Sequence, residues 1–409
     1  MDSKIPFNKP FITGKEIDYI AHAIESGQIA ADGEFTRKCA RLLENRFGML
    51  RVLMTPSCTA ALEMAAILCD LSEGDEVIMP SFAFASAANA VVRLGARPVF
   101  VDIRPDTLNI DERLIERAVT PHTKAILPVH YAGVACEMGQ IMALADKHGL
   151  IVIEDAAQGV NAFYNRLALG SIGHLGAYSF HETKNYVCGE GGALTINRPE
   201  FIERAEIIRE KGTNRSKFIR GEVNRYTWVD VGSSYLASEI SCAFLLAQLE
   251  AQDLITDRRR SIYNFYRRSL APLEERGLLR LPCIPEGCEN NFHLFYILVN
   301  DAVTRDELID YLWRKGIQAV FHYVPLHSSP MGGRFGYKTG DLPITEDLSA
   351  RLLRLPFFPE LTYEEQMRIV DHIAHFLERR FSGEMAQAGP LSKVDSQNDL
   401  AYDQPDAFV

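Results

Sequence analysis

The sequence predicts an α/β protein with a large domain on a mainly parallel sheet and a smaller, C-terminal α+β domain. From about residue 15, short apolar segments alternate with amphipathic helical patterns, which is typical of βαβ units. The apolar segments are continuous, as expected for strands buried on both faces. The length of 409 residues exceeds that of a typical single domain. We therefore expect a large domain with an N-terminal arm over residues 1–254, a connector helix and small domain over 255–380, and a disordered tail over 381–409.

The elements expected in the large domain follow one another at regular spacing. Apolar residues at helical spacing, and short apolar runs between them, define each element. The expected helices cover residues 15–26, 36–47, 59–69, 86–93, 111–119, 137–147, 201–210 and 237–250. The expected strands cover residues 51–54, 76–79, 98–101, 125–129, 150–153, 176–180 and 193–196.

The second part of the chain is expected to begin with a long charged helix over 255–270. The elements expected after it are strands at 293–299 and 317–321 and helices at 305–315, near 345–353 and at 364–380. Beyond residue 380 the chain is rich in Ser, Gln, Asp and Ala and has few large apolar residues. Such a composition cannot bury enough apolar surface to fold, so we predict disorder there.

Composition excludes several classes of protein. Hydrophobic residues make up 47% and charged residues 24% of the chain, which is ordinary for a globular protein. The net charge of −11 weighs against a nucleic-acid binder, and the absence of a long apolar run weighs against a membrane protein. The eight cysteines form no C-x-x-C pair, so we expect neither a disulfide framework nor a metal site. The first residues carry no apolar signal segment, and we expect a cytoplasmic protein.

A lysine stands at a position suited to chemistry. Lys184 follows the expected strand 176–180 and precedes a glycine cluster at 189–192. In open α/β sheets, ligands bind beyond the carboxyl ends of the strands, where such an amine can project into a cleft. Taken alone, an ordinary solvated lysine is the favoured interpretation.

An acidic pair follows another predicted strand end. The strand 150–153 runs into the segment 154–158, with the sequence EDAAQ. Its carboxylates would also lie beyond the carboxyl end of the sheet. The alternative is a simple helix cap, since Asp is a common N-cap residue.

A third motif joins the expected strand 51–54 to the next helix. The segment 55–61 has the sequence TPSCTAA, and its small residues leave backbone N–H groups exposed at a helix N-terminus. Such an end, with hydroxyl donors beside it, is suited to a phosphate group. An ordinary N-cap is again the alternative.

Together the three motifs predict a site for pyridoxal 5′-phosphate. Its phosphate requires N–H and hydroxyl donors, and its aldehyde requires an amine for a Schiff base. Its ring nitrogen requires an anion that keeps it protonated, because the protonated ring withdraws electrons. The segment 55–61 would bind the phosphate, Lys184 would form the Schiff base, and the acidic pair 154–155 would supply the anion for the ring nitrogen.

The chain resembles the DegT-type sugar-nucleotide aminotransferases, a family of fold-type-I pyridoxal-phosphate enzymes. The resemblance runs from residue 5 to about residue 380. It rests on the segments 58–62 (CTAAL), 80–84 (PSFAF), 154–158 (EDAAQ), 179–180 (SF) before Lys184, 191–192 (GG) and 321–327 (FHYVPLH). It implies a fold-type-I transferase and a homodimer whose active sites draw residues from both subunits.

The resemblance implies a role for each matching residue around the cofactor ring. Lys184 would form the Schiff base and later move the proton. Asp155 would pair with the ring nitrogen, and Gln158 would approach the ring hydroxyl. Phe84 would stack on the ring, although core packing is the favoured interpretation of that residue without the resemblance.

For the phosphate, the resemblance implies backbone N–H groups of Cys58 and Thr59 and hydroxyls of Thr59 and Ser179. Many members also carry a Gly-x-Asn-x-Arg stretch whose Asn reaches the phosphate in the neighbouring subunit. Here Ser234 stands at the Asn position and Leu236 at the Arg position. A serine hydroxyl can also donate to a phosphate, although its reach is shorter than that of an asparagine amide.

The implied reaction is transamination of a sugar nucleotide. The segments 128–138, 179–186, 209–216 and 232–236 resemble members that use glutamate to convert a dTDP-4-keto-6-deoxy-D-hexose into dTDP-4-amino-4,6-dideoxy-D-galactose. The alternatives are another keto-sugar nucleotide, such as one giving the 4-amino gluco epimer, a 3-keto sugar or a UDP or GDP sugar. A related dehydratase, with histidine in place of the lysine, is opposed by Lys184. A non-catalytic regulator that kept the fold is the remaining alternative.

Candidate substrate-binding residues come from two sources. Six basic residues lie between Arg209 and Arg225, among them Arg215, Lys217 and Arg220. A local cluster of this kind on an acidic protein can attract the diphosphate of a sugar nucleotide, whereas the alternative is a solvated helix end. His181, His322 and His327 are expected near the cleft, although a lone histidine is more often structural.

Overall fold

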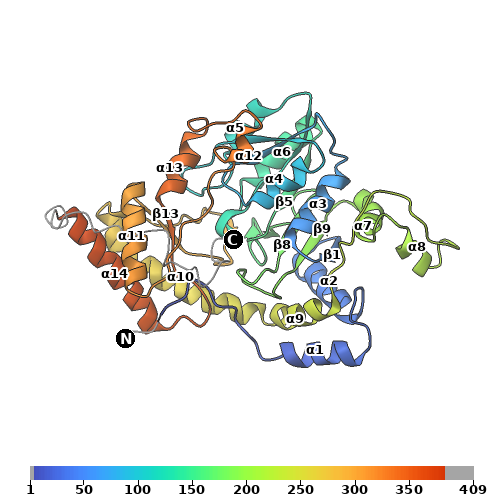
Figure 1. Cartoon of the computed structure of the whole chain (residues 1–409), viewed down its shortest axis with the longest axis horizontal. Helices are drawn as coiled ribbons and strands as arrows, with labels where there is room; N and C mark the ends of the chain where they lie inside the picture. The colour runs from blue at the N-terminus through green and yellow to red at the C-terminus, as the bar shows by residue number, and fades with distance from the viewer. Residues whose placement is uncertain (1–3, 383–409) are drawn as a thin grey trace.

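The computed structural model describes residues 4–382, so most of the tail predicted to be disordered lies outside the described residues. A seven-stranded sheet forms the centre of the large domain, in the order β1-β9-β8-β5-β4-β2-β3 (Figure 1). Every neighbouring pair is parallel except the two that involve β9. Its strands are β1 (Arg51–Thr55), β2 (Glu76–Pro80), β3 (Arg97–Val101), β4 (Thr123–Ile126), β5 (Ile151–Asp155), β8 (Leu175–Ser179) and β9 (Gly192–Ile196).

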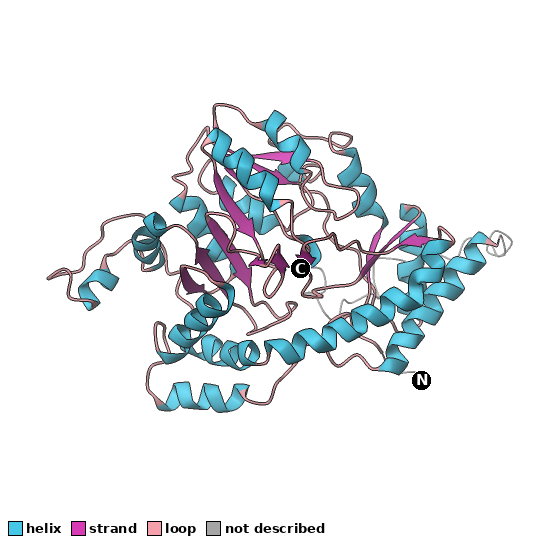
Figure 2. Ribbon diagram, turned by 180° about the vertical axis from the view of Figure 1, so that it is seen from behind, coloured by secondary structure: helices cyan, strands magenta, loops and turns pink. Residues whose placement is uncertain are grey.

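Helices and short turns cover both faces of this sheet (Figure 2). The helices and short turns of this part of the chain are α1 (Glu16–Glu25), α2 (Glu34–Phe47), α3 (Cys58–Leu68), α4 (Ala85–Val92), α5 (Glu112–Ala118), η1 (Tyr131–Gly133), α6 (Met138–His148), η2 (Pro199–Phe201), α7 (Ile202–Arg209), α8 (Arg215–Ile219) and α9 (Glu239–Glu250). Of these, α1 packs on α9, and α8 projects away from the sheet. A small second sheet joins β6 (Phe163–Tyr164) to β7 (Leu167–Ala168) and β11 (Cys288–Glu289).

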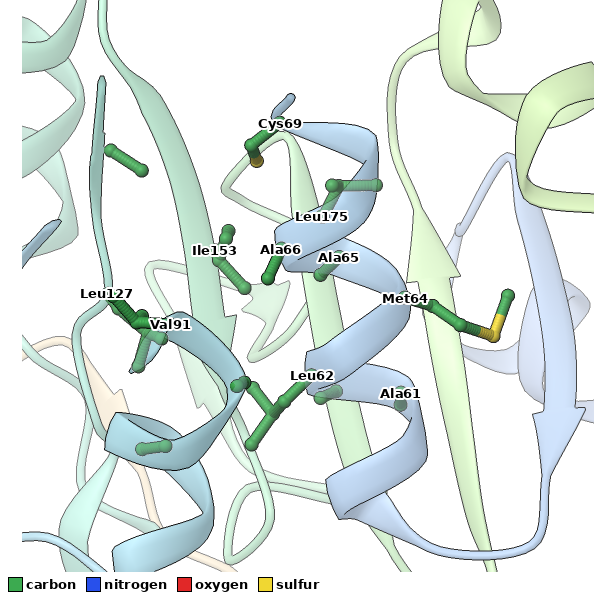
Figure 3. Close-up of a cluster of buried hydrophobic side chains, with 14 of the residues drawn as sticks. Ala61, Leu62, Met64, Ala65, Ala66, Cys69, Val91, Leu127, Ile153 and Leu175 are labelled. Atoms are coloured by element: carbon green, nitrogen blue, oxygen red, sulfur yellow. The ribbon is translucent and has the colours of Figure 1, made fainter. Parts of the chain in front are cut away.

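Helix α3 lies in the core of the large domain. It is apolar except for Thr59 and Glu63, and Leu62, Met64 and Ala65 are buried; a helix of this composition is stable only when other elements cover most of its surface. Figure 3 shows its side chains packed beside Val91 and the strand residues Leu127, Ile153 and Leu175. The N-terminus of α3 is thereby held rigidly at the edge of the sheet where β1 ends.

The long helix α10 (Gln252–Glu275) connects the large domain to the small one (Figure 2). The small domain has a three-stranded sheet in the order β10-β12-β13. Its strands are β10 (Leu279–Arg280), β12 (Tyr296–Val299) and β13 (Leu352–Arg354), and its helices are α11 (Ala302–Arg314), α12 (Pro330–Gly333), α13 (Pro343–Arg351) and α14 (Tyr363–Phe381). The N-terminal arm reaches this domain, because Ile5 forms a parallel bridge with Ile317.

The predicted elements are present, with differences in the small domain. The segment 317–321 forms no strand and makes only isolated bridges at Ile317 and Val320. The helix expected near 345–353 ends at Arg351, and the chain continues as β13. Leu352, Leu353 and Arg354 pair antiparallel with β12, so their backbone groups find hydrogen-bond partners in the sheet and not in a helix. The two-residue strands β6 and β7 were not predicted, since two residues are too few to show a period.

The described residues were also compared with the expectations about membrane spans, metal sites and disulfides. Over residues 4–382 no helix is long and apolar enough to cross a bilayer. No group of three or more potential metal ligands is found within that range. The eight cysteines all lie within it, and none is paired in a disulfide.

Candidate active site

The candidate site lies at the edge of the large sheet where two parallel strands end. Asp155 is the last residue of β5, and Ser179 is the last residue of β8. The two strands pair with Asp155 opposite Ala177, so their carboxyl ends lie side by side. Lys184 follows in the loop after β8, where its backbone N–H donates to the carbonyl of His181 at 2.9 Å.

The amine of Lys184 lies within the electrostatic field of Asp155. Burial lowers the pKa of Lys184, while the charge of Asp155 acts in the opposite direction and raises it. Burial raises the pKa of Asp155, and the charge of Lys184 opposes that shift. Asp155 at the end of β5 and Lys184 in the loop after β8 are therefore close enough for the charge of each to affect the pKa of the other.

Asp155 is held in place by its own backbone and by the layer beneath it. Its Oδ1 accepts a hydrogen bond from the N–H of Ala157 at 3.1 Å. Beneath it, the fully buried side chains of Glu154 and His130 form a pair, with Oε2 2.8 Å from Nε2. The Nδ1 of His130 accepts from the N–H of Cys136, so Nε2 carries the proton that is donated to Glu154. Glu154 thus has a structural role within the fold, whereas Asp155, also buried, ends β5 next to the loop that carries Lys184.

A cradle for an anion forms where β1 passes into α3. Ser57 caps the helix by accepting from the N–H of Ala60, and the hydroxyl of Thr59 lies 2.7 Å from that of Ser86. Gly192 packs so closely against this turn that a Cβ there would lie 2.3 Å from the carbonyl carbon of Ser57. Gly192 of β9 pairs with Ser179 of β8, so Ser179 lies one strand further from this turn at the same edge of the sheet.

Gln158 connects the large domain to the small one. Its Oε1 accepts from the N–H of Ala132 at 2.6 Å, and its Nε2 donates to the hydroxyl of Tyr323 at 2.8 Å. Phe84, 39% exposed, lies with its ring centre 6.4 Å from that of Tyr323. Tyr323 is a site residue that sequence reasoning did not single out, although it stands inside the segment 321–327.

The three candidate histidines have different surroundings. His322 is buried next to the site, with Nδ1 2.8 Å from the hydroxyl of Tyr131 and its ring stacked on Tyr323. Burial lowers its pKa well below the ordinary value. His181 has Nδ1 3.0 Å from the hydroxyl of Thr183, in the loop that carries Lys184.

His327 is placed differently from the other two. Its Nδ1 lies 2.7 Å from the hydroxyl of Ser81 and its Nε2 lies 2.8 Å from the carboxylate of Glu346. The side chain is completely buried, and both ring nitrogens are engaged by neighbouring protein groups. This geometry is typical of a histidine that joins two parts of a fold.

The basic residues predicted to bind the diphosphate lie away from Lys184 in the same chain. Arg215 and Lys217 lie on α8, which projects from the body of the molecule (Figure 1), and Arg220 ends that helix. Each is paired with a nearby acid of α7 or its end: Arg215 with Glu210, Lys217 with Glu203 and Arg220 with Glu206. Ser234 is exposed at the base of the same arm, where it bridges to Glu210.

A second group of residues that sequence reasoning missed forms the wall beside Lys184. The Oδ1 of Asn185 lies 2.9 Å from Nδ1 of His293, and its Nδ2 donates to the carbonyl of Asn291 at 2.8 Å. These three residues line one small cavity together with Gln158, Ser179 and Lys184. Asn185 could have been predicted as a site residue because it follows Lys184 directly. His293 and Asn291 lie more than 100 positions further along the chain, so the sequence gives no indication that they are near Lys184.

The residues present fit pyridoxal phosphate. The carboxylate of Asp155 is buried, and its charge affects the pKa of the buried amine of Lys184. The close approach of Gly192 leaves the turn at Ser57 and Cys58 free of a side chain that would fill the cradle. A carboxylate, an amine and a helix N-terminus with hydroxyl groups beside it thus lie at one edge of the sheet, which are the kinds of group that pyridoxal phosphate requires.

The profile of the DegT/DnrJ/EryC1/StrS aminotransferase family matches residues 10–374. The chain belongs to this family. It is 33% identical to the spore coat polysaccharide biosynthesis protein SpsC of Bacillus subtilis, over 90% of this chain and 96% of that protein. It is 38% identical to a pleiotropic regulatory protein of Geobacillus stearothermophilus, over 77% of this chain and 82% of that one.

A solved structure shows the same architecture. The PLP form of the putative sugar aminotransferase Spr1654 from Streptococcus pneumoniae is 26% identical and superposes with a TM-score of 0.85, over 92% of this chain and 99% of that one. The predicted fold class, the enzyme class and the cofactor are confirmed: the chain is a sugar aminotransferase that uses pyridoxal phosphate.

Proposed function

We propose that the chain transfers the amino group of glutamate to the C4 keto group of a dTDP-4-keto-6-deoxy-D-hexose. The products are dTDP-4-amino-4,6-dideoxy-D-galactose and 2-oxoglutarate. The observation that carries the reaction class is the shared site of Lys184 and Asp155 at the ends of β5 and β8. The proposed identity of the sugar and its nucleotide is supported by the resemblance of the segments 128–138, 179–186, 209–216 and 232–236.

The residues that would hold the cofactor are those at the strand ends. When bound, pyridoxal phosphate supplies an aldehyde that exchanges amino groups and a ring that withdraws electrons. Backbone N–H groups at the start of α3, from Cys58 and Thr59, would hold the phosphate with the help of the helix dipole. Hydroxyls of Thr59 and Ser179 would add donors. Asp155 would hold the ring nitrogen and keep it protonated.

Two further residues would orient the ring. Gln158 is fixed at both ends by Ala132 and Tyr323, so its amide can approach the ring hydroxyl without reorganising. Phe84 is partly exposed at the start of α4, and its ring would cover one face of the cofactor. Both contacts would be preformed, which reduces the entropy lost on binding.

Lys184 would act as the base once its nitrogen is released by the incoming amine. Its Nζ would take the proton from Cα of the donor and return it to the C4′ carbon of the cofactor, and the reverse transfer would serve the sugar. A general base works best with a pKa near the operating pH. Burial lowers the pKa of Lys184 toward that range.

The proposed assembly is a homodimer in the cytoplasm. The arm that follows α7 carries exposed apolar side chains, including Phe218, Ile219 and Trp228, the last of them 78% exposed. Large exposed apolar side chains grouped on one segment are typical of an interaction surface. Docked on a second copy, the arm would bring Ser234 and the basic residues of α8 toward the neighbouring site.

Two alternatives remain for experiment. In the first alternative, the chain acts on another keto-sugar nucleotide, and the segments that resemble dTDP-sugar enzymes bind a nucleotide with a different base. The name of the Geobacillus relative, a pleiotropic regulatory protein, is the observation that favours a regulatory function, which would add to or replace the enzymatic one. Lys184 and Asp155 are both present in this chain, which supports catalysis.

The deciding experiment incubates the purified protein with glutamate and a panel of keto-sugar nucleotides. The panel contains dTDP-4-keto-6-deoxy-D-glucose, its 3-keto isomer and UDP and GDP counterparts, and NMR gives the product configuration. We expect turnover of the dTDP-4-keto sugar to an axial C4 amine. An equatorial amine or preference for another nucleotide would overturn the proposed substrate. A colourless protein that does not take up added cofactor would favour the regulator.

A further inference from the structure

A separate cavity lies outside the candidate active site, along the outer edge of β1. Strand β1 is an edge strand of the large sheet, and helices α2 and α7 both contact it (Figure 1). The cavity has a volume of about 240 Å³ and is lined by β1, by α2 with the loop before it, and by the last residue of α7. It shares no lining residue with the cavity that contains Lys184.

The lining of this cavity carries more positive than negative charge. The chain as a whole has a net charge of −11, so a local excess of positive charge is not a general property of the molecule. A concave surface lined mainly by one sign of charge concentrates ligands of the opposite sign. The charged residues of the lining are the basic Arg37, Arg41, Arg51 and Arg209 and the acidic Asp32 and Glu44.

Arg209 is the most buried of the four arginines and keeps a donor without an acceptor. It ends α7 and is 8% exposed. Its Nη2 donates to Oδ1 of Asp32 at 2.6 Å, whereas its buried Nε has no hydrogen-bond partner within residues 4–382. An unsatisfied buried donor costs free energy, which the oxygens of an anion in the cavity would offset.

Arg51 has a similar environment on β1. Its Nη2 donates to Oε1 of Glu206 at 3.2 Å, while its Nε is buried and lacks a partner among the described residues. Glu206 also pairs with Arg220 of the arm, so this acid compensates two arginines. The positive charge of Arg51 is therefore only partly balanced.

Arg37 and Arg41 lie on α2, four positions apart. Residues at this spacing share one helix face, where like charges repel each other. The side chain of Arg37 donates to the backbone carbonyl of Asp32, and Arg41 makes no hydrogen bond or ion pair with any described residue. An anion bound between the two guanidinium groups would remove their repulsion.

The other basic residues of α2 that do not line the cavity have acidic partners. Lys38 pairs with Glu34, and Arg46 pairs with Asp253. Within residues 4–382, the two basic side chains of this helix without an acidic partner are thus the two that line the cavity. This distribution favours an anionic ligand over a merely solvated helix face.

We propose that this cavity binds a phosphate-type anion, with a diphosphate group as its preferred ligand. Guanidinium groups bind phosphate oxygens through paired hydrogen bonds, and four of them would surround both phosphates. The volume of about 240 Å³ lies below the range of about 300–1,000 Å³ for pockets that enclose drug-sized ligands. The diphosphate would come from free pyrophosphate or from a nucleotide whose base stays outside. This ligand is additional to the cofactor and substrates of the proposed function.

Calorimetry with inorganic pyrophosphate tests the proposal on the cofactor-loaded protein, in which pyridoxal phosphate occupies its own phosphate site. We expect saturable binding at about 0.15 M salt. Arg41→Gln and Arg37→Gln should each weaken the affinity at least about tenfold, as for loss of one charge-assisted hydrogen bond. Lys38→Gln is the matched control, because it removes the same charge from the same helix outside the cavity. Its affinity should change less than about twofold, since exposed charges are screened.

Thermal unfolding separates loss of the site from loss of the fold. Arg41→Gln removes a repulsion from α2, so the Tm of the anion-free protein should not fall. A ligand that binds only the folded state raises Tm. Pyrophosphate should therefore raise the Tm of the wild type and of Lys38→Gln, and raise that of Arg41→Gln much less.

Titration with dTDP distinguishes the two sources of the diphosphate. Binding tighter than that of pyrophosphate, and lost in Arg41→Gln, would assign the cavity to a nucleotide. Weaker binding that is also lost in Arg41→Gln would assign it to the free inorganic anion. Both results support a diphosphate site, and neither requires turnover of any keto sugar.

Three results would overturn the proposal. The first is pyrophosphate affinity that is the same in the wild type, Arg37→Gln and Arg41→Gln. The second is an equal loss of affinity in Lys38→Gln, which would show a long-range field and no site. The third is a wild-type protein that binds no pyrophosphate while Arg41→Gln shifts toward monomer, which would assign the cavity to an acidic segment of a second copy.

Discussion

Asp155, at the end of β5, and Lys184, in the loop after the neighbouring parallel strand β8, affect each other's pKa at one edge of the sheet. Asp155 ends β5, and Lys184 follows the end of β8, which pairs with β5 in parallel. Parallel pairing forces both carboxyl ends to the same edge. The register of two strands therefore brings the proposed acid partner and the amine together, although 28 residues separate them in the chain.

Removal of Lys184 is expected to stabilise the cofactor-free protein. Burial lowers the pKa of Lys184 in the folded state below the value of about 10.4 in the unfolded chain. Between these two values the unfolded chain binds more protons, so the stability of the wild-type protein rises with pH. Lys184→Met should thus raise Tm at pH 7, and the gain should shrink toward pH 10.

Thermal unfolding of cofactor-free protein at several pH values checks this. Lys124→Met, which replaces a lysine with a half-exposed side chain, is the control and should show no comparable gain. Lys184→Met must also lose transamination and any cofactor that borohydride can trap. A Tm that falls at pH 7 would show that the amine is not desolvated in the empty site.

Asp155→Asn is expected to keep part of the cofactor and to lose most of the activity, by about 100-fold or more, as for removal of a preorganised charged group. The amide leaves the ring nitrogen without the anion that keeps it protonated. Glu190→Gln is the matched control, since Glu190 also acts on Lys184 but its side chain is 71% exposed. Similar rates in both variants would remove Asp155 from its proposed role.

Gly192→Ala is expected to weaken cofactor binding. A Cβ at this position would lie 2.3 Å from the carbonyl carbon of Ser57 and 2.4 Å from the N of Cys58, and a backbone clash of this size cannot be relieved by a side-chain rotation. The turn must shift, which displaces the phosphate donors. Gly333→Ala, where a Cβ meets nothing within 4 Å, should bind as the wild type does. Spectrophotometric titration with pyridoxal phosphate compares the three proteins.

Light scattering coupled to size exclusion is expected to show a dimer. Replacing both Phe218 and Trp228 with Ser removes apolar surface from the arm and should shift the protein toward monomer, with a parallel loss of turnover. Tyr363→Ser removes a similarly exposed aromatic ring from α14 and serves as control. A wild-type protein that is monomeric at assay concentration would contradict the proposed shared site.

Sequence patterns predicted most of the fold and the strand ends of the site, because both depend on local order along the chain. The segments 55–61 and 154–158 each sit where a predicted strand ends, and parallel pairing then places them together. Tyr323, His293 and Asn291 reach the site through tertiary packing, for which a single sequence contains no periodic signal. For the basic cluster the sequence pattern was misleading. Arg215 and Arg220 were predicted to attract a diphosphate, but they pair with Glu210 and Glu206. These two acids belong to the preceding predicted helix, so the sequence pattern did not indicate the pairing.

The bridge between Ile5 and Ile317 has a practical consequence for dissecting this enzyme. Ile5 exchanges backbone hydrogen bonds with Gly316 and Gln318, and Phe7 accepts one from Phe357. A fragment that starts at α10 would leave those amides and a row of apolar side chains facing water. We therefore expect the small domain to need the N-terminal segment around Ile5 and Phe7 in the same polypeptide. An affinity tag fused directly ahead of Ile5 would lie next to the segment 316–318 of the small domain.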